Sequence, residues 1–145
     1  MNPFLYSVSL RISHPDIDPR LITDTLHIQP KGTWKFGEPR MTPTGTPLEG
    51  VNRNSFWHHK FSAPDDGQCF SFIRSVTLAL QPHRDFFHRL RAEGGDIEFF
   101  IGWFGNGNFG DTCPHDVSGI LADLKIDLGF DVYPDDDQVT QRSTV

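Results

Sequence analysis

Residues 14–39 constrain the fold more than any other part of the chain, because they combine a helix start, a helix end and a long turn-rich segment. Asp18 fits an N-cap, since its carboxylate can accept hydrogen bonds from backbone N–H groups that are unpaired at a helix start. Pro19 suits the first helical position, where its missing N–H costs nothing. The apolar residues Leu21, Ile22 and Leu26 follow on roughly one face of the helix. Pro30 and Gly32 then end it. The pattern predicts a helix over about residues 18–28.

The segment after this helix is rich in residues that interrupt regular structure. Residues 29–50 hold four prolines, four glycines and four threonines, which exclude a long helix or strand. A loop of this length inside a compact domain is usually functional or mobile. We therefore expect an irregular loop here.

The rest of the chain alternates strand and helix patterns. Strict apolar–polar alternation from Phe4 to Ile12 predicts a half-buried strand. The remaining predicted elements are a strand over 56–61, a helix over 72–92 broken at Pro82, an apolar strand over 97–104, a hairpin turn at Asn106-Gly107, a C-terminal helix that includes Leu128 and is closed by Gly129, and a strand over 130–133. The order favours a single α+β domain over residues 1–133, with a mixed, mostly antiparallel sheet and helices mainly on one face. Residues 134–145 are polar and acidic and predict a disordered tail. The first and last predicted helices share a similar sequence near their ends, Leu26-His27-Ile28 and Leu124-Lys125-Ile126. Two copies are too few to distinguish an internal repeat from coincidence.

Charge and cysteine content narrow the function classes. The formal net charge of −6 argues against nonspecific nucleic-acid binding, which depends on clustered Lys and Arg, and fits a basic partner or simple solubility. Two cysteines are too few for a disulfide scaffold, and the N-terminus lacks the pattern of a signal peptide. No run approaches the ~20 apolar residues of a membrane span. We expect a cytoplasmic protein with reduced thiols and no membrane contact.

No motif predicts a catalytic group, a cofactor or a metal site. Residues 105–110 match GxGxxG after a predicted strand, but no helix opens at the third glycine, so phosphate binding is disfavoured. His58 and His59 are adjacent and would point to opposite faces of a strand. Cys113 and His115 have no second pair of ligands at metal-site spacing, although a nucleophilic site on Cys113 or Cys69 remains open.

Surplus aromatic residues are the best functional signal. Periodicity does not assign all of them to a core, and Trp34 and Phe36 lie in the predicted loop, with Arg40 close by. They either fold back as a lid or form anchors of an interface, where Trp and Arg are favoured. The candidate partner-binding residues are Trp34, Phe36, Arg40, Trp57, Trp103 and Phe104.

Four segments resemble a known family. These are PDIDPRLITDTLHIQP, KGTWKFGEPR, the tryptophan-containing strand FWHHKF and the closing LADLKIDLGFDVYP. They are similar to the bacterial domain of unknown function 4279 family. The resemblance implies a small bacterial cytoplasmic α+β domain, with members linked to immunity proteins of toxin systems and no catalytic residues to carry over.

Two functions remain open. The first is a non-catalytic protein-binding module, in its sharper form an immunity-like protein that occludes a toxin or effector through its aromatic loop. The second is a small-molecule binder or small enzyme that uses a cleft under the 29–50 loop, with His58, His59 or Glu98 as polar groups. The oligomeric state is not predicted.

Overall fold

The computed structural model describes residues 1–134 and confirms an α+β domain. The predicted tail lies outside the described residues, except for Pro134, which ends the last strand. In chain order the elements are β1 (Phe4–His14), α1 (Pro19–Leu26), β2 (Gly32–Trp34), β3 (Pro39–Met41), β4 (Pro47–Val51), β5 (Ser55–Lys60), α2 (Cys69–Leu80), a 3-10 turn η1 (Gln81–His83), α3 (Arg84–Ala92), β6 (Asp96–Gly105), α4 (His115–Leu124) and β7 (Asp127–Pro134).

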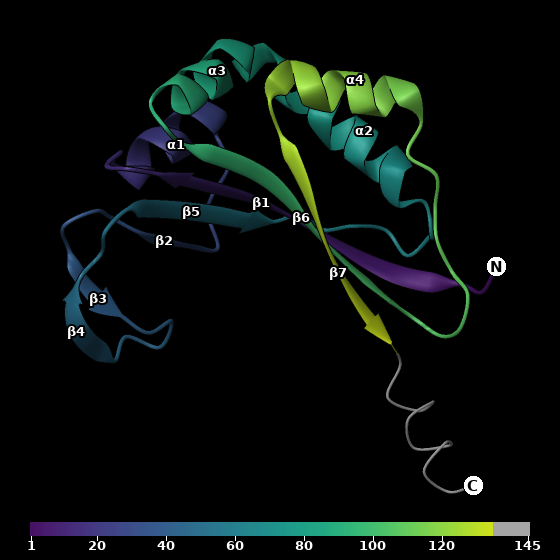
Figure 1. Cartoon of the computed structure of the whole chain (residues 1–145), viewed down its shortest axis with the longest axis horizontal. Coiled ribbons are helices and arrows are strands. Elements are labelled where there is room, and N and C mark those ends of the chain that lie inside the picture. The colour runs from purple at the N-terminus through teal and green to yellow at the C-terminus, as the bar shows by residue number, and fades with distance from the viewer. Residues whose placement is uncertain (135–145) are drawn as a thin grey trace, which may run out of the picture.

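A five-stranded sheet in the order β2-β5-β1-β6-β7 forms the centre of the fold. Its neighbouring strands are antiparallel except β6 and β7, which are parallel. The helices lie together over one face of this sheet (Figure 1). The predicted mixed, mostly antiparallel sheet with one-sided helices is therefore confirmed.

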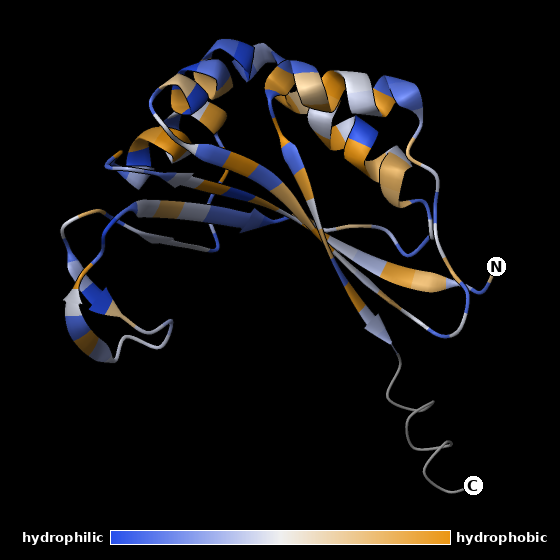
Figure 2. Cartoon of the chain, viewed as in Figure 1, coloured by the Kyte–Doolittle hydropathy of each residue, from blue (hydrophilic) through white to orange (hydrophobic). Residues whose placement is uncertain are grey.

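The core lies between the sheet and the helices because β1 alternates as predicted. Every second side chain of β1 is buried, and its partners on β6 face the same way, so Val8 lies opposite Ile101 and Leu10 opposite Phe99. Apolar residues recur along β1, β6 and the helices above them (Figure 2). The interrupted helix is also confirmed, since η1 separates α2 from α3 at Pro82.

The 29–50 segment is more regular than predicted. Its glycines and prolines do exclude long elements, but they leave room for three short strands. β2 joins the edge of the main sheet beside β5, while β3 and β4 pair with each other as a separate hairpin. The expectation of an irregular loop was wrong at this point.

Two expectations near the C-terminus also needed correction. No strand returns after Asn106-Gly107; instead α4 carries the chain to β7, which runs parallel to β6. Phe109 packs on Phe4 with ring centroids 5.5 Å apart, and Asp111 Oδ2 accepts a hydrogen bond from the Phe70 backbone N–H at 3.0 Å. These contacts hold the segment against the start of β1 and the start of α2, so it adds no strand to the sheet.

The C-terminal helix is shorter than predicted. It ends at Leu124, and Lys125 takes the left-handed conformation of a C-cap with φ of 57°. Leu128 and Gly129 therefore belong to β7.

Candidate partner-binding surface

The residues between Lys31 and Asn54 form a projection that we call the aromatic arm. It consists of β2 and the β3–β4 hairpin, and the hairpin extends from the sheet on the side away from the helices (Figure 1). Exposed large apolar side chains gather on it, although a domain of this size would be expected to bury most of them. These are Trp34 (45% exposed), Phe36 (50%), Met41 (61%), Leu48 (44%) and Val51 (53%). In Figure 2 the hairpin carries both hydrophilic and hydrophobic segments.

Trp34 is exposed yet held in one orientation. Its ring stacks on Phe56 of the adjacent strand with centroids 4.4 Å apart and planes 25° apart. Its indole N–H donates to Asn54 Oδ1 at 3.1 Å. An aromatic side chain fixed in this way loses little conformational freedom on binding.

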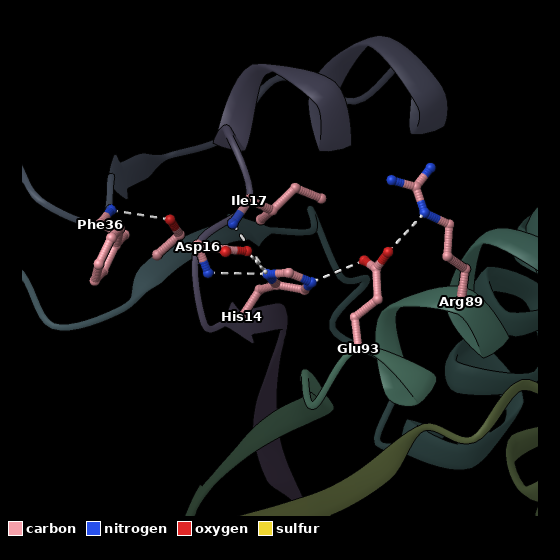
Figure 3. A network of polar contacts seen from close by, with 7 residues as sticks. His14, Asp16, Ile17, Phe36, Arg89 and Glu93 are labelled. Atoms are coloured by element: carbon pink, nitrogen blue, oxygen red, sulfur yellow. Dashed lines mark hydrogen bonds and ion pairs between the residues drawn. The ribbon is translucent and has the colours of Figure 1, made fainter.

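A polar network lies at the base of the arm, with His14 and Ser55 buried in it (Figure 3). The Phe36 backbone N–H donates to Ser55 Oγ at 3.0 Å, and Ser55 lies opposite His14 in the β1–β5 register. His14 Nδ1 accepts the backbone N–H groups of Asp16 and Ile17 at 3.1 and 3.0 Å. The imidazole proton must then sit on Nε2.

His14 Nε2–H donates to Glu93 Oε1 at 2.9 Å, and Arg89 donates to the other oxygen of Glu93 at 3.1 Å. The hydrogen bonds from His14 and then Arg89 lower the pKa of the Glu93 carboxyl. The geometry looks like a catalytic histidine–carboxylate pair, but the acceptor nitrogen of His14 already serves two backbone donors. The pair therefore acts as a clamp between the β1–α1 turn and α3.

A cleft of about 660 Å³ lies between the β3–β4 hairpin and the sheet edge formed by β2 and β5. Trp34 and His58 line it from the sheet, and Met41 lines it from the hairpin. Gly32 makes room for the imidazole, since a Cβ there would lie 2.8 Å from His58 Nε2. Burial, and then the nearby cation Arg11, lower the pKa of His58, which favours the uncharged imidazole.

The face of the sheet that the helices leave uncovered continues from this cleft, and we call it the open face. Alternate residues of β5 and β1 point onto it, and Arg11 lies there with its guanidinium carbon 3.7 Å from the centre of the Phe100 ring. Glu98 is opposite Arg11 across the β1–β6 pair. Glu98 thus lies beside Asp96 and Asp127 on the far half of the sheet and does not reach the cleft.

The structure brings together three of the six predicted partner-binding residues. Trp34, Phe36 and Arg40 all lie on the arm, where Arg40 Nη1 donates to the Glu49 carbonyl at 3.1 Å. Phe104 is 40% exposed but belongs to another surface, where it stacks on Tyr133 with centroids 4.8 Å apart.

The two other predicted residues pack into the protein. Trp57 is fully buried, and its indole N–H donates to Thr23 Oγ1 at 3.0 Å. Its place among the partner-binding residues was wrong, because its strand turns this residue toward the helices. Trp103 is half-buried and packs against Phe4 and Phe70.

The residues considered for catalysis do not converge. His59 points to the face opposite His58, as predicted, and its Nδ1 lies 2.7 Å from the Gln29 carbonyl oxygen. Cys113 contacts Ser118 Oγ at 3.4 Å, and burial raises the pKa of the Cys69 thiol to about 11. Within residues 1–134, no group of three or more His, Cys, Asp or Glu side chains is placed to hold a metal ion. In the same part of the chain, no helix has the length and apolar character needed to cross a membrane.

Sequence reasoning missed several members of the surface. Phe56 supports Trp34, and the aliphatic residues Met41, Leu48 and Val51 add to the exposed arm. Phe56 and His58 lie on one face of β5 and Trp57 on the other, because side chains alternate along a strand. The sequence could therefore have separated Trp57 from the other two residues. Nothing in the composition of the hairpin indicated which of its apolar residues stay exposed.

One family model matches the chain. It is described as Domain of unknown function (DUF4279) and covers residues 4–135. The searches of curated proteins and of solved structures found no match.

Proposed function

The chain belongs to the family described as Domain of unknown function (DUF4279), and we propose that it binds another protein through the aromatic arm without catalysing a reaction. The sharper form of the proposal is an immunity-like role, in which the bound protein is a toxin or effector whose working surface the arm covers. We place this role in the bacterial cytoplasm, where two free cysteines would stay reduced.

One observation carries the proposal: five large apolar side chains stay exposed within the 18 residues from Trp34 to Val51. Exposed apolar clusters of this kind mark interaction sites on soluble proteins. Tryptophan and arginine dominate the binding energy of interfaces, and both occur here as Trp34 and Arg40. The fixed orientation of Trp34 supports its role as the central anchor.

A small-molecule site is the second candidate. The cleft of about 660 Å³ under the arm supports it, since ligand pockets typically measure about 300–1,000 Å³. Its polar lining includes Lys31, Glu38 and the imidazole of His58, whose pKa is lowered by burial. A small enzyme at this cleft would use His58 as its proton-transfer group, because His59 and Glu98 do not line the cleft.

Paired alanine variants test the main proposal. The wild-type chain is used to capture proteins from cell extract, and the identified partner is purified and titrated by calorimetry. Trp34→Ala is expected to weaken binding by about 30-fold or more, as for a hot-spot residue. Phe104→Ala removes a similarly exposed ring from another surface and should change affinity by less than about threefold.

Two results would contradict the proposal. One is a Trp34→Ala variant that keeps full affinity for every identified partner. The other is a larger loss from Phe104→Ala than from Trp34→Ala. A metabolite that raises the unfolding temperature of the wild type, but not of a His58→Ala variant, would favour the second candidate.

A further inference from the structure

We infer that the partner of the aromatic arm is a protein that presents acidic side chains around an apolar anchor. The inference rests on the proposed protein-binding role of the arm and adds the chemistry of the partner. It also replaces the expectation of a basic partner, which followed from the net charge of the whole chain.

Charge is divided unevenly between the arm region and the rest of the molecule. Residues 31–60, which are the arm and β5, contain five Lys and Arg against two Asp and Glu, a net charge of +3. The remaining residues carry eight Lys and Arg against seventeen Asp and Glu, a net charge of −9. The segment that carries Trp34 and Phe36 is therefore basic, although the chain as a whole carries −6.

Ion pairing sharpens this division. The arginines of α2 and α3 are neutralised by carboxylates of the same molecule, as in the pairs Arg74–Asp116 and Arg84–Asp123. In the arm region only Lys35 approaches a carboxylate, at 3.6 Å from Asp18. The other four cations form no ion pair within residues 1–134; they are Lys31, Arg40, Arg53 and Lys60.

Three of these four cations lie on the arm itself, and Lys60 ends β5 outside it. Lys31 lines the same cleft as Trp34 and Met41. Arg40 precedes Met41 on β3, the first strand of the hairpin. Arg53 is exposed between β4 and β5. A basic rim around an apolar centre complements a partner surface in which carboxylates surround an inserted side chain.

The same observations favour protein over nucleic acid. Three of the five exposed apolar residues of the arm are aliphatic, and only Trp34 and Phe36 present rings on which bases could stack. Glu38 and Glu49 interrupt the basic residues of the hairpin. The far half of the open face, with Glu98, Asp96 and Asp127 on β6 and β7, would repel a long phosphate backbone that extended across the sheet from the arm.

Two matched peptides test the inference on the full chain. In one peptide a central leucine is flanked by glutamates, and in the other the glutamates are replaced by lysines. Each is titrated into isotopically labelled protein while backbone amide NMR signals are followed at low and at high salt. A single-stranded DNA oligonucleotide serves as a third probe.

We expect the glutamate peptide to shift signals of residues 31–60 and to bind at least about fivefold tighter than the lysine peptide at low salt. Arg53→Glu should remove most of this difference. Lys125→Glu changes the net charge equally at an exposed position outside the arm, and should preserve the difference.

Equal binding of both peptides, preference for the lysine peptide, or an absence of shifts in residues 31–60 would overturn the inference. Tighter binding of the oligonucleotide at the arm would overturn the choice of protein. The proposed function fails separately, through an identified partner that does not depend on Trp34. If Trp34→Ala weakens that partner while the peptides bind equally, only the acidic chemistry is wrong.

Discussion

At the residue scale, the face to which a side chain points decides its role. β5 places Trp57 toward the helices and its neighbours Phe56 and His58 on the open face. The sequence shows which residues of β5 share a face, but it does not show which of the two faces meets the core. Because large rings occur on both faces of β5, composition did not reveal which one was buried. Trp57 was consequently grouped with exposed anchors.

The two tryptophans should differ sharply in their contribution to stability. Trp57→Ala removes a fully buried ring, and we expect it to lower the free energy of unfolding by about 3–5 kcal/mol. Trp34→Ala loses an exposed ring and its stack on Phe56, so its cost should stay below about 1.5 kcal/mol. Urea unfolding of both variants measures the difference, and equal losses would contradict the assigned burial.

At the element scale, the helix boundaries show what local sequence reasoning can predict. Asp18 caps α1 as expected, because capping depends on the few residues around it. The shared pattern at Leu26-His27-Ile28 and Leu124-Lys125-Ile126 corresponds to a common conformation, since His27 and Lys125 are both left-handed C-caps with φ of 56° and 57°. The paths of residues 106–114 and of β7 were mispredicted because they depend on distant contacts, such as Phe109 with Phe4.

The start of α1 should contribute to stability in a pH-dependent way. The Arg20 side chain, and then its backbone N–H, donate hydrogen bonds that hold the pKa of the Asp18 carboxyl well below its usual range. Since the folded pKa is lower than the unfolded one, this stabilisation is fully present above the unfolded pKa of about 3.9 and is lost as the pH falls toward the folded pKa. Asp18→Asn keeps an N-cap acceptor but does not titrate. We expect its free energy of unfolding to depend less on pH below about pH 4 than that of the wild type, as measured by urea unfolding across this range. Parallel curves would contradict the role of Asp18.

Two glycines in different elements should respond in opposite ways to alanine. At Gly95, between α3 and β6, a Cβ would lie 2.8 Å from the Leu90 carbonyl oxygen and 3.0 Å from that of Ser13. Both contacts are with backbone, so Gly95→Ala should destabilise by about 1–3 kcal/mol. Gly119 lies inside α4 with nothing within 4 Å of its Cβ position, and Gly119→Ala should stabilise by about 0.5–1 kcal/mol. Thermal and urea unfolding of the two variants check both signs; a stable Gly95→Ala protein would show that the α3–β6 connection can move.

At the scale of the whole molecule, stability and recognition occupy different parts of the chain. The core lies between the sheet and the helices, whereas β3 and β4 pair only with each other among the described strands. The arginines of α2 and α3 are neutralised on the helical side, whereas three of the cations without an ion pair in residues 1–134 lie on the arm: Lys31, Arg40 and Arg53. The hairpin can therefore carry exposed apolar and charged residues without weakening the core.

This separation predicts that the hairpin can be removed without unfolding the domain. Its base is closed by hydrogen bonds from the Gly37 N–H to the Asn52 carbonyl and from the Asn52 N–H to the Glu38 carbonyl, both 2.9 Å long. Replacing residues 39–51 by a short Asn-Gly link is thus compatible with the positions of both ends. We expect cooperative urea unfolding with a free energy within about 2 kcal/mol of the wild type, because no core residue is lost. Amide NMR signals of the core strands and helices should be retained while binding to the arm's partner disappears. Loss of cooperative unfolding would show that the hairpin is part of the domain's stability, and that its exposed residues cannot be assigned to recognition alone.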